Sequence, residues 1–284
     1  MFVMDYVRNS PIPFGKLRVV DLFVDVFLRN KSKKRAAQLV HGDYRLCVDI
    51  SFFLQRQFYF FGDYWLEREL IALWKDYTVQ ANIVFDVGAN LGIYSLAAAS
   101  VNKTASIYAF EPTSEIVVAL KDTLLKNQIQ NVNVVAAAVM NAPGLVDLNS
   151  CSGGKANDGM NYVTRGDKIA SMSTSRIPSV SLDEFCQEQG ISVIDLIKID
   201  VQGMEYEVLE GASGMLESGA IRTIFIELNW HQDGRGGVAE DVVNRLSELG
   251  YGFRAKETAW QLRQRGDWIY GCSDVIAEKG ATGR

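Results

Sequence analysis

The amino-acid sequence predicts an α/β fold with an open, mostly parallel sheet, and three observations support this prediction. From residue 82 onward, short apolar runs alternate with segments of helical period, which is the pattern of parallel strands joined by crossover helices. The run 83–87 leads into a turn that carries Gly88 and Gly92, as strand-to-helix turns of such sheets do. The last two apolar runs have no helix between them, so one strand should be antiparallel.

Each element follows from a local pattern of residues. Strands are predicted where apolar runs are short, and helices where apolar residues recur every three or four positions. Gly250 marks the end of the last helix, because a glycine commonly follows a helix C-terminus. The expected strands are residues 83–87, 105–110, 131–139, 193–200, 222–228, 251–255 and 268–277, and the expected helices are residues 92–99, 114–126, 204–216 and 238–249.

Two segments depart from this alternation. Residues 1–78 form a predicted N-terminal extension to an α/β domain at residues 79–284, with a helix expected from Asp63 and many aromatic residues that suit either a core or a cap over the site. Within it, the basic run 29–35 is interpreted as a solvated helix end, although a basic amphipathic segment can also lie on an anionic membrane. Residues 150–176 are polar and without period, which predicts a long loop that is either a substrate loop or disordered.

Composition excludes several classes of protein. The net charge of −5 offers no broad attraction for nucleic acid. Asp5 and Arg8 interrupt the N-terminus before a signal peptide could form, and no apolar run is long enough to span a membrane. The four cysteines are far apart, as expected of reduced thiols in a cytoplasmic protein. With only His41 and His231, a histidine-rich metal site is excluded.

Two ligand classes are open for the turn after the first strand. A nicotinamide dinucleotide requires GxGxxG, whose middle glycine lets the backbone approach the pyrophosphate. Asn90 stands at the middle position and would crowd a pyrophosphate, and Asp86 would repel one. S-adenosylmethionine carries no phosphate, and Glu111, after the second strand, can accept hydrogen bonds from both ribose hydroxyl groups. The residues therefore favour S-adenosylmethionine.

At three motifs the chain resembles the FkbM-type methyltransferases. The motifs are DVGANLG at residues 86–92, YAFEP at 108–112 and LIKIDVQGMEYEVLEGA at 196–212. The resemblance implies a Rossmann-like class I methyltransferase fold, with a seven-stranded sheet whose last strand is antiparallel, and S-adenosylmethionine as the cofactor. Where the family usually reads KIDVEGAE, this chain has Gln202 and Met204.

The resemblance also assigns residues to the cofactor. Glu111 would hold the ribose, and Ala138 and Val139, at the end of the third expected strand, would flank the adenine. Met140 and Asn141 stand where an acidic partner of the adenine is usual. The residues that would form the cofactor turn are Asp86, Gly88, Asn90 and Gly92.

Three side chains near expected strand ends are candidate catalytic groups. Methyl transfer to a hydroxyl group requires that a base remove its proton. Asp200 ends the fourth strand, where it also suits a helix N-cap, and Glu227 is a carboxylate in an otherwise apolar strand. His231 titrates near neutral pH, although a single loop histidine is usually incidental. The oxygen atoms of Asp200, Glu227 and Asn229 offer a further possibility, a Mg²⁺ site.

The expected function is O-methylation of a small molecule, and the resemblance supplies the substrate class of sugars, polyketides and peptide natural products. N-methylation stays open, because an amine acceptor needs less help from a base. The rival classes are a nicotinamide-dependent oxidoreductase and a cofactor-binding module without catalytic activity. The expected partners are a small-molecule substrate and further copies of this chain in a homo-oligomer, without nucleic acid or stable membrane insertion.

Overall fold

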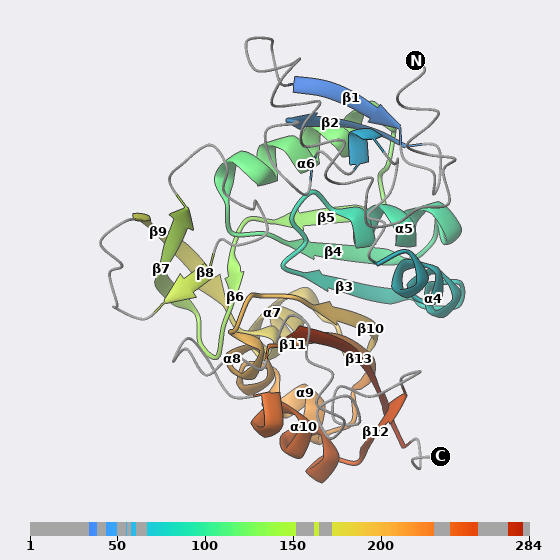
Figure 1. The fold of residues 1–284 in the computed structure, drawn as a ribbon. Coiled ribbons are helices and arrows are strands. Elements are labelled where there is room, and N and C mark those ends of the chain that lie inside the picture. The colour runs from blue at the N-terminus through green and yellow to red at the C-terminus, as the bar shows by residue number, and fades with distance from the viewer. Residues whose placement is uncertain are drawn as a thin grey trace.

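The main sheet has seven strands in the order β12-β13-β11-β10-β3-β4-β5 (Figure 1). The computed structural model describes residues 34–38, 44–49, 55, 58–60, 67–151, 162–164, 172–229, 239–254 and 272–280. β13 runs antiparallel to both of its neighbours, and the other pairings are parallel, which confirms the predicted sheet. The strands are β3 Ile83–Val87, β4 Ser106–Phe110, β5 Val132–Val135, β10 Ile194–Ile199, β11 Ile221–Asn229, β12 Tyr251–Arg254 and β13 Cys272–Lys279.

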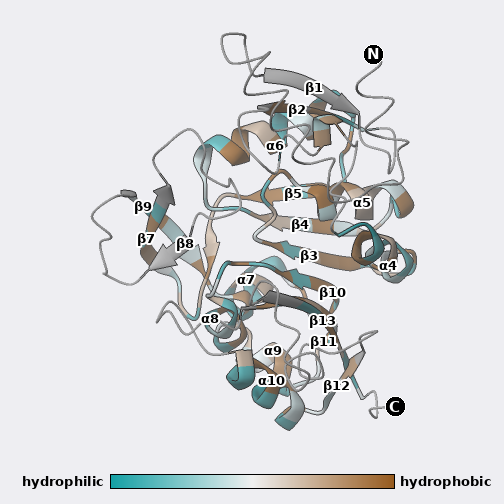
Figure 2. Cartoon of the chain, viewed as in Figure 1, coloured by the Kyte–Doolittle hydropathy of each residue, from teal (hydrophilic) through white to brown (hydrophobic). Residues whose placement is uncertain are grey.

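Helices cover both faces of this sheet because the strands are apolar on both sides, as Figure 2 shows for the central strands. Alternate strand residues enter two hydrophobic clusters: Val84 and Ile107 lie in one, and Phe85 and Ile197 in the other. The first cluster is covered by α4 Arg68–Thr78, α5 Ile93–Val101 and α6 Ser114–Lys126, and the second by α7 Leu182–Gln189, α8 Glu205–Glu210, α9 Ser213–Glu217 and α10 Ala239–Glu248.

The described part of the N-terminal extension packs into the first cluster. Trp74 of α4 is fully buried, donates its indole N–H to the Tyr94 carbonyl (2.9 Å) and meets the Phe225 ring edge-on at 5.3 Å. Strands β1 Lys34–Gln38 and β2 Arg45–Asp49 pair antiparallel. The interpretation of the basic run as a helix end was therefore wrong for its last two residues, because Lys34 and Arg35 pair with β2 instead. Residues 19–33 lie outside the described chain.

The prediction of one continuous strand over residues 131–139 was wrong. β5 ends at Val135, and β6 Ala138–Val139 joins a separate sheet in the order β6-β9-β7-β8, seen at the left of Figure 1. The other members are β7 Gly144–Cys151, β8 Tyr162–Thr164 and β9 Met172–Val180. The predicted loop 150–176 is therefore partly strand. Backbone pairing between β7 and β9 orders a polar sequence that buries few apolar side chains, such as Leu148 and Ile177, so its sequence lacks the usual alternation.

The helix predicted over residues 204–216 is divided into α8 and α9. A Cβ atom on Gly211, between them, would lie 2.1 Å from the Met140 carbonyl oxygen, so the break lets the chain pass close to the end of β6. α7 was not predicted; Ser181 caps its N-terminus by accepting a hydrogen bond from the Glu184 N–H (3.4 Å). Among the described residues, every helix is too short or too polar to cross a bilayer.

Candidate active site

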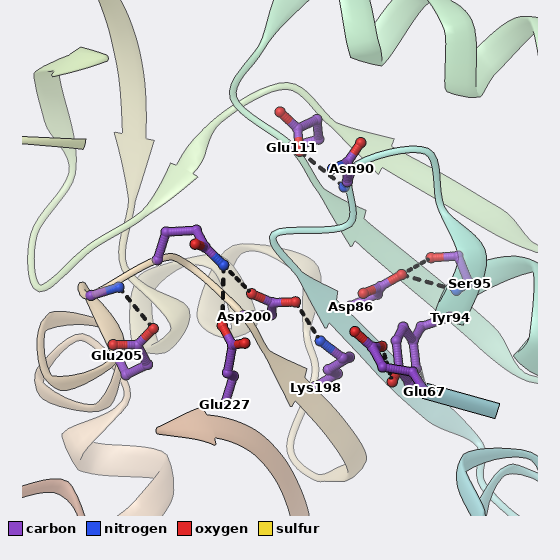
Figure 3. A network of polar contacts seen from close by, with 12 residues as sticks. Glu67, Asp86, Asn90, Tyr94, Ser95, Glu111, Lys198, Asp200, Glu205 and Glu227 are labelled. Atoms are coloured by element: carbon purple, nitrogen blue, oxygen red, sulfur yellow. Dashed lines mark hydrogen bonds and ion pairs between the residues drawn. The ribbon is translucent and has the colours of Figure 1, made fainter. Parts of the chain in front are cut away.

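The polar residues of the site gather where β3, β4, β10 and β11 end (Figure 3). Strand pairing explains why several of them share a face of the sheet. Lys198 lies beside Asp86 of β3 on one side and beside Phe225 of β11 on the other. Because side chains alternate along a strand, Asp200 and Glu227, two residues further on, point to the same face as Lys198. This is the face that α4 and α5 cover.

The turn between β3 and α5 is held to the end of β4. The backbone N–H groups of Gly88 and Ala89 both donate to the Phe110 carbonyl (3.0 and 2.9 Å). Gly88, Asn90 and Gly92 all have positive φ (80°, 49° and 78°), a conformation that favours glycine and tolerates asparagine. The residue types at these three positions are therefore compatible with the backbone of the turn, which favours glycine at each of them.

Glu111 connects this turn to the start of the next helix. Its Oε2 accepts the Asn90 N–H (2.9 Å) and its Oε1 accepts the Thr113 N–H (2.8 Å). The side chain is 5% exposed, and burial raises the pKa of its carboxyl group above the usual range. Each oxygen keeps a second lone pair that can accept a hydroxyl group, so the carboxylate is held in one orientation with acceptor capacity left over.

The residues at this turn fit a ribose-bearing cofactor. Among the described residues, no group donates a hydrogen bond to the buried Asn90 Oδ1, and a buried acceptor without a donor is costly. This atom belongs to the residue whose N–H binds Glu111. A ligand that donates hydroxyl or amino hydrogens at this position would satisfy Asn90 Oδ1 and Glu111 together, which matches the polar groups of S-adenosylmethionine.

Asp86 lies deeper than its predicted role implies. It is 1% exposed, and its Oδ2 accepts both the Ser95 hydroxyl (2.6 Å) and the Ser95 N–H (2.9 Å) from α5. Burial raises the pKa of its carboxyl group. In the structure Asp86 therefore fixes α5 to β3, and its contact with a cofactor stays a prediction.

Lys198 is a buried cation that the sequence analysis did not single out. It is 3% exposed, its Nζ lies 2.8 Å from Asp200 Oδ2, and it stands 4.4 Å from the centre of the Tyr94 ring. Burial alone would lower the pKa of Lys198, but the charges of Asp200, Glu67 and Asp274 raise it above its ordinary value. A lysine in an otherwise apolar strand, two residues before an aspartate, is the sequence signal that could have identified it.

Gln202 connects the two predicted catalytic carboxyl groups. Its side-chain nitrogen donates to Asp200 Oδ1 (2.9 Å) and to Glu227 Oε2 (3.1 Å). Burial opposes ionisation of Asp200, but the Lys198 ammonium lowers its pKa below the usual range. Repulsion by Asp200 is the main cause that raises the pKa of Glu227 well above the usual range. Asp200 is therefore the charged member of the pair and Glu227 the neutral one.

These contacts do not fit the Mg²⁺ hypothesis. Hydrogen-bond donors already occupy both oxygens of Asp200 and one oxygen of Glu227, and the nearest of them is the ammonium group of Lys198. The positive charge of Lys198, 2.8 Å from Asp200 Oδ2, would repel a divalent cation at this position. Within the described residues, no group of three or more His, Cys, Asp and Glu side chains could hold a metal ion.

The structure brings together most of the predicted site residues. Asp200 and Glu227 share one hydrogen-bond donor, and Glu111 and Asn90 form the neighbouring polar cluster. Ala138 and Val139 are buried in β6, just beyond β5, and their contact with adenine stays a prediction. His231 and the side chain of Asn229 lie outside the described part of the chain.

Glu67, immediately before α4, extends the acidic surroundings of Lys198. Its Oε2 accepts the Tyr94 hydroxyl (2.6 Å), and burial raises its pKa to about 7. Because the folded state favours its protonated form, Glu67 contributes stability that is fully present below the unfolded pKa of about 4.5 and is lost as the pH rises through 7. Glu67→Gln should therefore flatten the fall in the free energy of unfolding between pH 4.5 and 7, measured by urea denaturation.

The matched control for this prediction is Glu188→Gln, at an exposed position of α7. It should leave the slope of stability against pH as in the unmodified protein. An equal slope in the Glu67→Gln protein would show that Glu67 titrates alike in the folded and unfolded states.

The sheet order, its single antiparallel strand and the polar turn after β3 define the class I methyltransferase fold. Residues 86–253, more than half of the chain, match the family described as the methyltransferase FkbM domain. The chain belongs to this family and is a methyltransferase.

Two of the curated proteins to which the chain is similar are named as methyltransferases. It is 26% identical over 188 residues to the hexuronic acid methyltransferase AglP of Haloferax volcanii, covering 64% of this chain and 68% of AglP. It is 22% identical over 144 residues to the 2-O-methyltransferase NoeI of Sinorhizobium fredii, covering 47% of this chain and 58% of NoeI. Among solved structures, it is similar to a putative methyltransferase from Streptococcus mutans in complex with SAH (TM-score 0.45, 13% identity, covering 74% of this chain and 97% of the other).

Proposed function

We propose that this protein transfers a methyl group from S-adenosylmethionine to a hydroxyl group of a small molecule, with a sugar as the first acceptor class to test. The observation that carries the proposal is the position of the Asp200–Glu227 pair on the same sheet edge as the Glu111–Asn90 cluster (Figure 3). One cluster suits the donor and the other can receive a proton from the acceptor. The name of AglP supports a sugar-derived acceptor, and the name of NoeI supports methyl transfer to an oxygen atom.

On the donor side, Glu111 and Asn90 would bind the ribose, and Ala138 and Val139 would border the adenine. When bound, S-adenosylmethionine would supply a methyl group attached to a positively charged sulfur. The leaving group would be the sulfur, as a neutral thioether. Since the reaction is a displacement, the main task of the protein is to align the acceptor oxygen with the methyl carbon.

On the acceptor side, Asp200 is the proposed general base. As the acceptor oxygen bonds to the methyl carbon, its O–H bond becomes strongly acidic, so a carboxylate of ordinary or lowered basicity can take the proton. Asp200 is charged because Lys198 stabilises its negative form. Glu227, held neutral beside it, can donate a hydrogen bond to the acceptor or to Asp200.

The first experiment measures methyl transfer directly. Purified protein is incubated with S-adenosylmethionine and a panel of uronic acids and neutral sugars, and products are detected as a mass increase of one methyl group. Asp200→Asn should lower turnover about 10²-fold or more, whereas Asp76→Asn, at an exposed position on α4, should not change it. Calorimetric titration with S-adenosylhomocysteine and with NAD tests the donor class, and binding of NAD alone would refute the proposal.

A further inference from the structure

The side chain of Gln202 has a position that the family resemblance does not explain. At this position the related motif usually has a glutamate, and here the amide nitrogen lies between two carboxyl groups, 2.9 Å from Asp200 Oδ1 and 3.1 Å from Glu227 Oε2. Asp200 directly follows β10 and Glu227 lies in β11, so the amide connects two elements. A glutamate in its place would bring a third carboxyl group to the same point, beside the charged Asp200.

The backbone also holds Gln202 in a special conformation. Its φ is 56°, in the left-handed region that residues other than glycine rarely adopt. It is followed by Gly203, whose φ is 100° and whose N–H donates to Glu205 Oε1 (2.9 Å). This tight turn directs the side chain at residue 202 back toward the strand ends, where its two hydrogen bonds reach Asp200 and Glu227, both labelled in Figure 3.

The two carboxyl groups share one hydrogen-bond donor and are half-buried. Two carboxylates close enough to share one donor cannot both be ionised without a large cost. The Lys198 ammonium compensates Asp200 through its other oxygen, Oδ2. The Gln202 amide is thus the group that binds both members of the pair, and an amide has two N–H hydrogens, one for each carboxyl group.

We propose that Gln202 is a positioning residue that holds Asp200 and Glu227 together as a pair sharing one proton. This inference rests on the proposed function, in which Asp200 receives the proton of the acceptor. In this arrangement Gln202 stabilises the charged Asp200 through one hydrogen and keeps Glu227 at hydrogen-bonding distance through the other. Its role differs from that of Asp200, since it exchanges no proton itself.

Other ionisable groups surround the pair and set the background against which the effect of Gln202 must be measured. They come from each element packed against the strand ends. These groups are Lys198 on β10, Asp86 on β3, Asp274 on β13, Tyr94 on α5, Glu205 on α8 and Glu67 before α4.

Three variants test the proposal. Gln202→Leu keeps the approximate size of the side chain and removes both hydrogen bonds. Gln202→Glu adds a third carboxyl group. Gln128→Leu is the matched control, because Gln128 has nearly the same φ (55°) and is exposed in a different part of the fold. It therefore reports what a leucine costs in this backbone conformation.

The first measurement is a carbon-13 NMR titration of labelled Asp and Glu carboxyl groups, with Asp200→Asn and Glu227→Gln proteins to assign the signals. The midpoint at which Asp200 gains a proton should shift upward by about one pH unit in Gln202→Leu, since a hydrogen bond to the charged form is lost. It should shift further in Gln202→Glu, and it should not move in Gln128→Leu. An unchanged midpoint in both Gln202 variants would overturn the proposal.

The second measurement is kinetic. In Gln202→Leu, kcat for methyl transfer should fall about tenfold or more and the acid limb of its pH profile should move upward, with KM for S-adenosylmethionine unchanged. A purely structural role would raise KM or lower stability without moving the pH profile, and that result would count against the proposal. The NMR titration needs no acceptor, so a shifted midpoint without methyl transfer would refute the proposed function and leave the bridge intact.

Discussion

Replacing Gly88 by alanine should destabilise the protein by about 3 kcal/mol or more. An added Cβ atom would lie 1.9 Å from the Asp200 carbonyl oxygen and 2.9 Å from its carbonyl carbon. Both are backbone atoms of the chain that continues from β10, so no side-chain rotation can relieve the overlap. The positive φ of 80° adds strain of about 1–2 kcal/mol for a residue with a Cβ atom.

The comparison that isolates the overlap is Gly190→Ala. Gly190 also has a positive φ (67°), but an added Cβ atom would meet nothing within 4 Å, so this variant should lose only the strain of about 1–2 kcal/mol. Urea denaturation gives the free energy of unfolding of each protein. If the two variants were equally stable, the close approach of the β3 turn to the end of β10 would not exist in solution.

The outcome also bears on the site, because Gly88 and Asp200 are in contact through their backbones. Any displacement that accommodates a methyl group must move Asp200 away from the turn or move the turn away from Glu111. Gly88 was assigned to the cofactor turn by resemblance. The structure adds a second reason for a glycine, which is to let the turn after β3 approach the end of β10.

Replacing Glu111 by glutamine should weaken the binding of S-adenosylhomocysteine by about 1–3 kcal/mol. The carboxylate accepts two backbone N–H groups, one on each oxygen. A glutamine can accept only one of them, because its NH₂ group would face the other N–H, and it loses an acceptor for the ribose. Calorimetric titration measures the change in affinity.

Glu115→Gln is the control for this substitution. Glu115 is the next glutamate along the chain and lies exposed in the first turn of α6, so its replacement should leave the affinity unchanged. Thermal unfolding of both variants without ligand would show whether the turn itself has been weakened. An unchanged affinity in a folded Glu111→Gln protein would remove Glu111 from the ribose site.

Local sequence patterns predicted most of the central sheet and did not predict the second sheet. β3, β4, β10 and β11 are nearly continuous apolar runs, since both of their faces are covered by helices. The strands β7 and β9 are ordered mainly by pairing with each other, and the serine and threonine residues of β9 resemble a loop. The predicted strand 131–139 continued past the end of β5 because three successive alanines, residues 136–138, give no signal for the change of sheet.

Within the site, motif residues were predictable and their partners were not. Asp200 and Glu227 stand out as carboxylates at the ends of apolar strands. Gln202 looked like the loss of a carboxylate, whereas in the fold it supplies the donor that both carboxyl groups share. Glu67 lies more than a hundred residues before Lys198 in the sequence, and only the packing of α4 beside β10 brings them together.

The sequence by itself determined the parallel sheet, the glycine-bearing turn, the acidic residue after the second strand and the family of methyltransferases. These depend on short-range patterns, because hydrophobic period and backbone conformation are properties of neighbouring residues. The tertiary structure decided which carboxyl group is charged, since this depends on Lys198, Gln202 and Asp274 meeting at one sheet edge. Electrostatic energies vary with distance and burial in space, and neither is determined by position along the chain.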